Sequence, residues 1–346
     1  MSESIVASLI VEVRELLRAA RVVAARQVNA LAVLTNFEIG RRIVQHEQGG
    51  EPRAEYGKSL LQALSHALTE EFGRGYSLEN LRLFRRFFLV YQDRLPKSQT
   101  VSGISSTSPF TLGWSHYAFL TGIDDPAERT FYEIEATKQS WSLRELRRQY
   151  DTSLYERLAL SRDKDAVHTL ATEGHVVSKP SDLLKEPYVL EFLGLEQRPS
   201  YSESELEASI IDKLEHFLLE LGKGFLFEGR QRRFTFDDEH FYVDLVLYNR
   251  LLRCFVLIDL KIGKLTHQDL GQMQMYVNYY DRHVKLPEEG PTIGIILCKK
   301  KHEALVEITL PEGANIHARE YRLILPSKED LRSKLLEWTA SIGQED

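Results

Sequence analysis

The chain has 346 residues, of which 43% are hydrophobic and 27% are charged. This is ordinary globular composition, and because domains commonly run to roughly 100–200 residues, two domains are expected. No apolar run approaches the ~20 residues that a membrane-spanning helix needs, and the first residues lack the basic leader of a signal peptide, which predicts a cytoplasmic protein. The two cysteines, Cys254 and Cys298, are too few and too far apart for a zinc site or a disulfide framework.

The formal net charge of −7 is unevenly distributed along the chain. Residues 1–165 contain 22 Lys/Arg and 21 Asp/Glu (+1), whereas the remaining residues contain 22 Lys/Arg and 30 Asp/Glu (−8). Binding to nucleic acid depends on local patches rather than on the total charge, so an acidic protein is not excluded from it. An acidic carboxy-terminal part also suits capture of Mg²⁺ through carboxylates.

Residues 1–165 show helical periodicity and predict an all-α domain. Glycines and N-cap residues divide it, and a Ser/Gly-rich stretch over 96–110 predicts an exposed loop. The capping box of Ser142 and Glu145 starts a further helix. The main helices are expected at Ser4–Gln48, Tyr56–Phe72 and Leu78–Tyr91.

The second and third of these helices, joined by the turn at 73–77, resemble a helix-turn-helix pair. Arginines recur at i, i+3 and i+4 on two helices, a spacing that suits contacts to phosphate. A solvated helix face has the same pattern. The candidate DNA-binding residues are Arg82, Arg85, Arg86, Arg144, Arg147 and Arg148.

Residues 166–202 contain three prolines and predict a connector, after which the pattern changes. An amphipathic helix over Glu203–Leu221 precedes three strand-like runs, a helix near Gln268–Asp281 and an apolar strand at Pro291–Cys298. The order α-β-β-β-α-β predicts a mixed sheet flanked by helices over residues 203–346. The strand-like runs are Phe225–Arg232, Phe241–Tyr248 and Cys254–Lys261, and a last strand is expected near Tyr321–Leu325.

Two of these strands carry acids among apolar residues. Asp244 interrupts one apolar run, and Asp259 and Lys261 lie two apart at the end of the next, so that they share a face. Two neighbouring acids hold a hard cation, and a nearby lysine can position a water. Gln272 and Tyr276, four apart on the following helix, can orient that water or contact a phosphate. An Asp-x-Lys alone also fits a solvated pair at a strand end, but the ordered set favours metal-dependent phosphodiester hydrolysis.

This order of Asp, Asp-x-Lys and Gln-x-x-x-Tyr resembles the PD-(D/E)XK superfamily, which includes restriction endonucleases, junction resolvases and RecB-type nuclease domains. Nearly the whole chain resembles the bacterial YhcG-like proteins, in which a helical amino-terminal domain precedes such a nuclease domain. The stretches that carry the resemblance include Phe37–Arg41, Phe72–Tyr76, Trp114–Tyr117, Trp141–Leu146, Glu186–Leu193 and Phe217–Gly222.

The resemblance implies an α+β protein: an all-α, DNA-binding domain followed by a restriction-endonuclease-like α/β domain. It implies Asp244, Asp259 and the backbone carbonyl of Leu260 as ligands of Mg²⁺ or Mn²⁺, with Lys261, Gln272 and Tyr276 completing the catalytic set. The expected substrate is duplex or branched DNA, cut in defence or recombination, and two strands favour a homodimer or a higher even oligomer.

Three points stay open at this level. Asp259 stands where close relatives are expected to carry the longer Glu, which leaves a catalytically inactive DNA-binding or adaptor protein as an alternative. An RNA-processing nuclease of the same chemistry is a second alternative. The helical glutamate that completes such sites is one of Glu207, Glu215 and Glu220.

Overall fold

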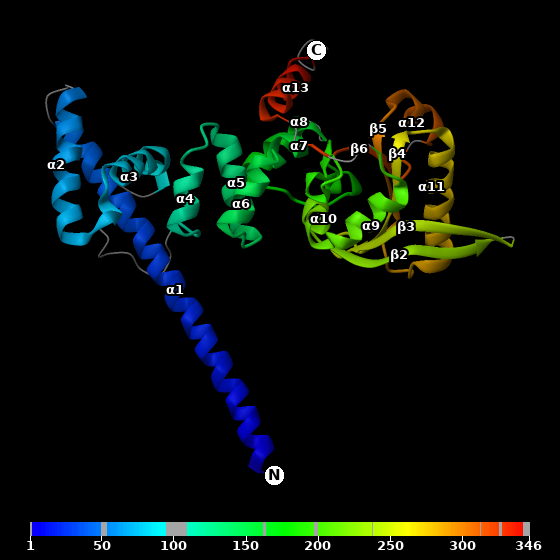
Figure 1. Cartoon of the computed structure of the whole chain (residues 1–346), viewed down its shortest axis with the longest axis horizontal. Helices are drawn as coiled ribbons and strands as arrows, with labels where there is room; N and C mark the ends of the chain where they lie inside the picture. The colour runs from blue at the N-terminus through cyan, green and yellow to red at the C-terminus, as the bar shows by residue number, and fades with distance from the viewer. Residues whose placement is uncertain are drawn as a thin grey trace. The chain divides into compact units, whose positions relative to one another are not determined.

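The computed structural model of the chain describes residues 2–49, 54–94, 109–161, 164–196, 200–236, 238–311, 313–324 and 327–341 (Figure 1). Most of the predicted loop at 96–110 lies outside the described residues. The chain divides into two compact units, Met1–Leu146 and Arg147–Asp346. The segment 147–165, expected with the helical domain, therefore packs in the second unit. No helix within the described ranges is long and apolar enough to cross a membrane.

The first unit is helical, as predicted. It contains α1 (Ser2–Gly49), α2 (Ala54–Phe72), α3 (Leu78–Tyr91), α4 (Trp114–Leu120), α5 (Pro126–Lys138) and the start of α6 (Leu143–Asp151).

Close packing of α1 against α3 organises this unit. A Cβ atom added at Gly40 would lie 2.1 Å from the backbone oxygen of Phe84, so only glycine allows this approach. Phe37 on α1 packs edge-on against Phe87, with ring centroids 5.8 Å apart. The turn between α2 and α3 contains a short 3₁₀ segment, Arg74–Tyr76, and Ser77 caps α3 by accepting from Asn80 N. The predicted helix-turn-helix pair is thus present as two helices and a tight turn.

The second unit contains a six-stranded mixed sheet in the order β1-β6-β5-β4-β3-β2. β2–β3 and β3–β4 are antiparallel, whereas β4–β5, β5–β6 and β1–β6 are parallel. The strands are β1 (Tyr188–Val189), β2 (Phe225–Phe236), β3 (Glu239–Asn249), β4 (Cys254–Lys264), β5 (Ile293–Lys300) and β6 (Ile316–Arg322). The helices are α7 (Leu154–Leu160), α8 (Lys164–Glu173), α9 (Glu203–Asp212), α10 (Leu214–Leu221), α11 (His267–Tyr279), α12 (Glu303–Thr309) and α13 (Lys328–Ser341).

Helices cover both faces of this sheet, in agreement with the predicted α-β-β-β-α-β order. Alternate residues of β4 divide between two cores: Ile258 and Leu260 pack with α9 and α10, and Leu257 packs with α11. The one helix predicted over Glu203–Leu221 is two, because the backbone leaves the helical conformation at Lys213 (φ −117°, ψ 31°). β1, within the predicted connector, pairs with β6 and belongs to the sheet.

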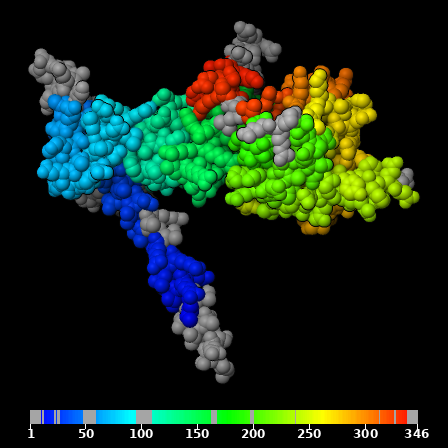
Figure 2. Space-filling view, in the orientation of Figure 1, coloured from blue at the N-terminus to red at the C-terminus, as the bar shows by residue number. Residues whose placement is uncertain are grey.

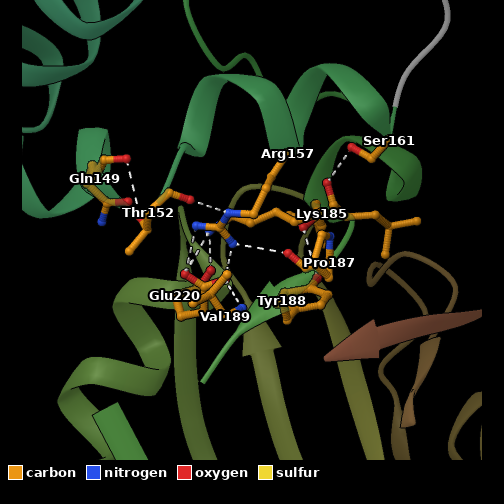
Figure 3. A network of polar contacts seen from close by, with 11 residues as sticks. Gln149, Thr152, Arg157, Ser161, Lys185, Pro187, Tyr188, Val189 and Glu220 are labelled. Carbon is orange, nitrogen blue, oxygen red and sulfur yellow. Dashed lines mark hydrogen bonds and ion pairs between the residues drawn. The ribbon is translucent and has the colours of Figure 1, made fainter. Parts of the chain in front are cut away.

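A buried ion-pair network joins α7 to α10 (Figure 3). The guanidinium of Arg157, fully buried, donates to both carboxylate oxygens of Glu220 and to the carbonyls of Thr152 and Pro187. Val189 N donates to the same carboxylate at 2.9 Å. These contacts explain why the segment around Arg157 belongs to the second unit: a buried charge without its partner costs several kcal/mol.

Candidate active site

The candidate active site begins where β3 and β4 separate. Their antiparallel ladder runs from Asn249–Cys254 to Leu245–Ile258 and stops there. At the next position, Oδ2 of Asp244 accepts the backbone N–H of Leu260 at 2.8 Å. Beyond this point β4 continues beside β5, and β3 continues beside β2. We call this point, flanked by Asp244 and Asp259, the strand fork.

The strand fork brings Asp259 and Lys261 together on one face of β4. The Lys261 ammonium lies 2.8 Å from Oδ2 of Asp259 and 3.9 Å from Oε2 of Glu203 on α9. Asp259 is only 3% exposed. The pKa of Asp259 is raised to about 7 overall, because burial outweighs the lowering by Lys261, and the charge of the nearby Asp244 adds to the rise. The pKa of Lys261 is raised overall, because attraction to Asp259 outweighs the lowering by burial.

Gln231 on β2 connects Asp244 to α9. Its side-chain amide donates to Oε2 of Glu207 at 2.6 Å and to Oδ1 of Asp244 at 3.0 Å. Gln231 and Asp244 face each other between the paired positions 230–245 and 232–243 but are not themselves paired. Gln231 has a positive φ of 47°, which is unfavourable for a residue with a side chain. This conformation accompanies the turn of the amide toward the two carboxylates.

Of the three candidate glutamates, Glu207 is therefore the one that Gln231 links to Asp244. Burial raises its pKa, the Asp244 charge adds to the rise, and Gln231 opposes it. Of the other two candidates, Glu220 is held by Arg157, and Glu215 is exposed to solvent. The sequence alone did not single out Gln231 or Glu203, since neither follows a motif spacing. Their positions depend on how β2 and α9 pack.

Gln272 and Tyr276 lie together on α11, where the Gln272 amide donates to the Tyr276 hydroxyl. Tyr276 is 1% exposed. Burial raises its pKa, the Gln272 hydrogen bond lowers it, and the charges of Asp259 and Asp244 raise it further. The hydroxyl therefore lies within electrostatic reach of both acids, which brings the predicted accessory pair to the same region as the strand fork.

The donor atoms of the strand fork fit a hard divalent cation. In the described ranges, no three His, Cys, Asp or Glu side chains are grouped closely enough to hold a metal. The site offers two carboxylates, those of Asp244 and Asp259, beside the Leu260 backbone. Mg²⁺ and Mn²⁺ accept such a set, because these ions keep several waters and prefer oxygen ligands. A buried acid with a raised pKa also gains most from a nearby cation.

The predicted DNA-binding arginines differ in the partners that they contact. On α3, Arg85 pairs with Glu47 at 2.6 Å and Arg86 with Asp124 at 2.8 Å. Arg82 is exposed and forms no ion pair among the described residues. On α6, Arg144 is exposed, and the Arg148 guanidinium lies 5.5 Å from the centre of the Phe192 ring. The spacing of the two sets was predicted, but their ion pairs were not.

The mixed sheet and the flanking helices are those of a PDDEXK-type nuclease domain. Residues 181–336 match the family described as YhcG PDDEXK nuclease domain, and residues 12–157 match the DUF1016 N-terminal domain. The chain is 41% identical, over 95% of its length and 93% of the relative's, to the Escherichia coli (strain K12) protein named "Putative nuclease YhcG". It belongs to the YhcG family.

Two solved structures align with parts of the chain. A repair endonuclease from Pyrococcus abyssi is 19% identical over 37% of this chain and 50% of its own, with a TM-score of 0.24. An EndoMS–dsDNA complex is 16% identical over 38% of this chain and 49% of its own, with a TM-score of 0.26. The aligned part thus spans about half of each of these structures.

Proposed function

We propose that this YhcG-family protein is a DNA endonuclease that requires Mg²⁺ or Mn²⁺ and hydrolyses phosphodiester bonds at the strand fork. The observation that carries the proposal is the hydrogen bond from Leu260 N to Asp244, because Leu260 lies on β4 between the buried Asp259 and its partner Lys261. Two oxygen donors and one ammonium around a single point supply what hydrolysis of a phosphate diester requires.

In this proposal Asp244 and Asp259 hold the cation, with the Leu260 carbonyl as a further oxygen donor. The bound cation supplies charge neutralisation at the phosphate and lowers the pKa of a coordinated water. Lys261 would orient the attacking water and receive part of the phosphate charge. Gln231 keeps Asp244 in position through its second bond to Glu207, and Gln272 with Tyr276 donates to the water or to a phosphate oxygen.

The helical unit supplies targeting in this proposal. The exposed Arg82 and Arg144 suit phosphate contacts directly. The ion pairs of Arg85 and Arg86 are partly exposed, and such pairs are weak enough to exchange an acid for a phosphate. Arg147 and Arg148, the first two residues of the second unit, complete the proposed set. Cutting both strands of duplex or branched DNA calls for two sites, so we expect a homodimer or a higher even oligomer.

A second function has one observation in its favour. Lys261 already neutralises Asp259, and Asp has a reach about 1.5 Å shorter than the expected Glu, the length of one carbon–carbon bond. A site in which Lys261 pairs with the short Asp259 carboxylate suits a DNA-binding or adaptor protein that keeps the nuclease fold without the activity. Nuclease action on RNA is the other alternative and requires the same metal chemistry.

The test is cleavage of plasmid, branched DNA and structured RNA with Mg²⁺, Mn²⁺ or EDTA. Native protein is compared with Asp259→Ala and Lys261→Ala, and circular dichroism checks that both variants fold. We expect metal-dependent DNA cleavage that both substitutions abolish. DNA binding with neither cleavage nor metal binding would establish the adaptor function, and cleavage confined to RNA would reject DNA as the substrate.

A further inference from the structure

The β2–β3 hairpin extends beyond the strand fork as an arm (Figures 1 and 2). We use hairpin arm for residues 232–236 and 238–243. Its strands stay paired to the tip, from Arg232–Val243 to Phe236–Glu239. An unsupported two-stranded ribbon is at best marginally stable in water, so the hairpin arm depends on packing against one of its faces.

One face of the hairpin arm is packed against α11. Phe234 stacks on Tyr279 with ring centroids 4.1 Å apart and meets Tyr276 edge-on at 5.6 Å. Its cross-strand partner Phe241 stacks on it at 5.5 Å. Val243 belongs to the same core cluster. This face fixes the arm to the helix that carries Gln272 and Tyr276, and so fixes it relative to the candidate active site.

The side-chain alternation of β3 changes phase at the strand fork. Leu245 packs in the core beneath α9 and α10, whereas Val243, two residues along, packs in the core beneath α11. Between them lies Asp244, opposite the unpaired, left-handed Gln231. As a result, the face of the arm opposite Phe234 is continuous with the side on which Gln231 meets Glu207.

That second face is exposed and contains groups that bind a nucleic-acid backbone. Arg233 lies opposite Tyr242, and Thr235 lies opposite His240 and shares a 2.9 Å hydrogen bond with it. Arg233, Thr235 and His240 are exposed, and Tyr242 is 45% exposed. In the described part of the chain, Arg233 has no acidic partner, whereas its neighbour Arg232 is held by Glu228.

We propose that this face of the hairpin arm binds the phosphate backbone of duplex DNA next to the bond that is cut. Arg233 and the Tyr242 hydroxyl, which lie opposite each other, contact the backbone at one position, and Thr235 with His240 contacts it further out. Arginine and tyrosine are common partners of DNA phosphates. The inference rests on the proposed function, because it takes the strand fork as the point of cleavage.

The dimensions agree with this placement. Each two-residue step along a strand covers about 7 Å, so the Arg233–Tyr242 pair lies one such step beyond Gln231 and Asp244. DNA has one phosphate per strand for about every 3.4 Å of helix axis. A duplex that runs along the arm therefore places Arg233 about two nucleotides from the scissile phosphate. The Thr235–His240 pair lies about two nucleotides further.

A structural explanation competes with this one. β2 is an edge strand of the sheet, and charged residues on an exposed edge prevent pairing with a second chain. Arg233 would then act against aggregation and have no ligand. The two explanations differ in what Arg233→Ala changes: DNA affinity in the first, self-association in the second.

The experiment measures binding of the full-length protein to a fluorescently labelled 30-base-pair duplex by anisotropy, in EDTA, over a series of salt concentrations. Native protein is compared with Arg233→Ala, Arg233→Lys and the matched control Arg232→Ala. We expect Arg233→Ala to weaken binding and to reduce the slope of log K against log salt by about 0.9, the value for one lost phosphate contact. Arg233→Lys should retain most of that slope, and Arg232→Ala should match native protein.

Each outcome decides the proposal. An unchanged slope in Arg233→Ala, with or without self-association by light scattering, overturns it even if native protein cleaves DNA. A reduced slope in a protein that never cleaves supports the DNA-binding face while it rejects the endonuclease. Absence of duplex binding, or preference for an RNA duplex of equal length, overturns the proposal.

Discussion

The backbone amide of Leu260 donates a 2.8 Å hydrogen bond to Asp244 at the position where the β3–β4 ladder ends. An acidic side chain thus accepts a bond that a strand carbonyl would otherwise accept. The same residue closes the ladder and supplies a candidate metal ligand. Its position is therefore determined by the sheet itself, and it does not depend on a flexible loop.

Asp244→Asn should separate the two roles of this residue. The amide oxygen can still accept from Leu260 N, so the melting temperature should change by no more than a few degrees. The charge is lost, and we expect Mn²⁺ affinity and DNA cleavage to fall by about 100-fold or more. Calorimetric titration with Mn²⁺ and plasmid cleavage measure the two effects. Equal metal affinity in native and variant protein would remove Asp244 from the ligand set.

Asp259→Glu tests whether the shorter side chain of aspartate at this position leaves the site active. The added methylene moves the carboxylate about 1.5 Å toward the strand fork, and overpacking at this buried position costs about 1–3 kcal/mol. If the native site is active, Asp259→Glu should keep metal-dependent cleavage and Asp259→Ala should abolish it. If native protein is inactive and Asp259→Glu gains cleavage, the adaptor function applies to the native chain. Cleavage by Asp259→Ala equal to native would refute both assignments of Asp259.

Gln231 lends itself to a paired comparison because of its positive φ. Gln231→Ala and Gln231→Gly both remove the bridge between Asp244 and Glu207, and both should weaken Mn²⁺ binding by about 10–100-fold. Glycine adopts φ 47° without strain, so Gln231→Gly should be more stable than Gln231→Ala by about 1 kcal/mol. Urea unfolding measures this difference. An alanine variant as stable as the glycine variant would show that the backbone relaxes when the bridge is lost.

The Arg157–Glu220 pair predicts a large and specific loss of stability. Arg157→Ala leaves the buried Glu220 carboxylate without its main counter-charge, with only Lys185 nearby at 4.0 Å, which costs about 3–5 kcal/mol in unfolding free energy. The double variant Arg157→Met/Glu220→Leu should lose much less, because it removes the buried carboxylate together with its arginine, and Lys185 keeps its hydrogen bond to the backbone carbonyl of residue 220. Chemical denaturation of the three proteins measures both values. A double variant as unstable as Arg157→Ala would mean that packing, and not charge, dominates.

The same pair predicts an acid-dependent loss of stability. Burial opposes ionisation of Glu220, but Arg157 and Lys185 outweigh it, so the pKa of Glu220 is lowered from the usual 4.5. A carboxylate whose pKa is lower in the folded than in the unfolded state stabilises the fold at pH values above about 4.5. That stabilisation is lost as the pH falls through the folded-state pKa. The melting temperature of native protein should therefore fall more steeply below pH 4.5 than that of the double variant. Parallel curves for the two proteins would contradict this.

The sequence predicted the fold because its signals were local. Apolar strands with a single acid, a capped helix and the alternation of β4 all follow from short-range periodicity. The α+β class and the strand order along the chain were confirmed, as was the family that the motifs resemble. The break at Lys213 and the two-residue strand β1 were not predicted, since neither has a breaker or a periodic pattern.

The residues around the candidate site also divide into those predicted from local patterns and those placed by packing. Asp244, Asp259 and Lys261 follow from strand periodicity, whereas the choice of Glu207 over Glu215 and Glu220 requires knowing how α9 and α10 pack. Gln231 was missed because its role comes from a left-handed backbone opposite Asp244, and no pattern in the sequence predicts that conformation. Arg157, which the sequence presents as one more helix arginine, is fully buried.

The matched DUF1016 segment ends at residue 157, and the matched nuclease segment begins at residue 181. The Arg157–Glu220 bond therefore crosses the border between the two recognised modules. Exchange of either module between relatives should cost stability where it leaves a buried charge at position 157 or 220 without its partner. The two modules should thus be inherited together, as parts that evolve under a shared constraint.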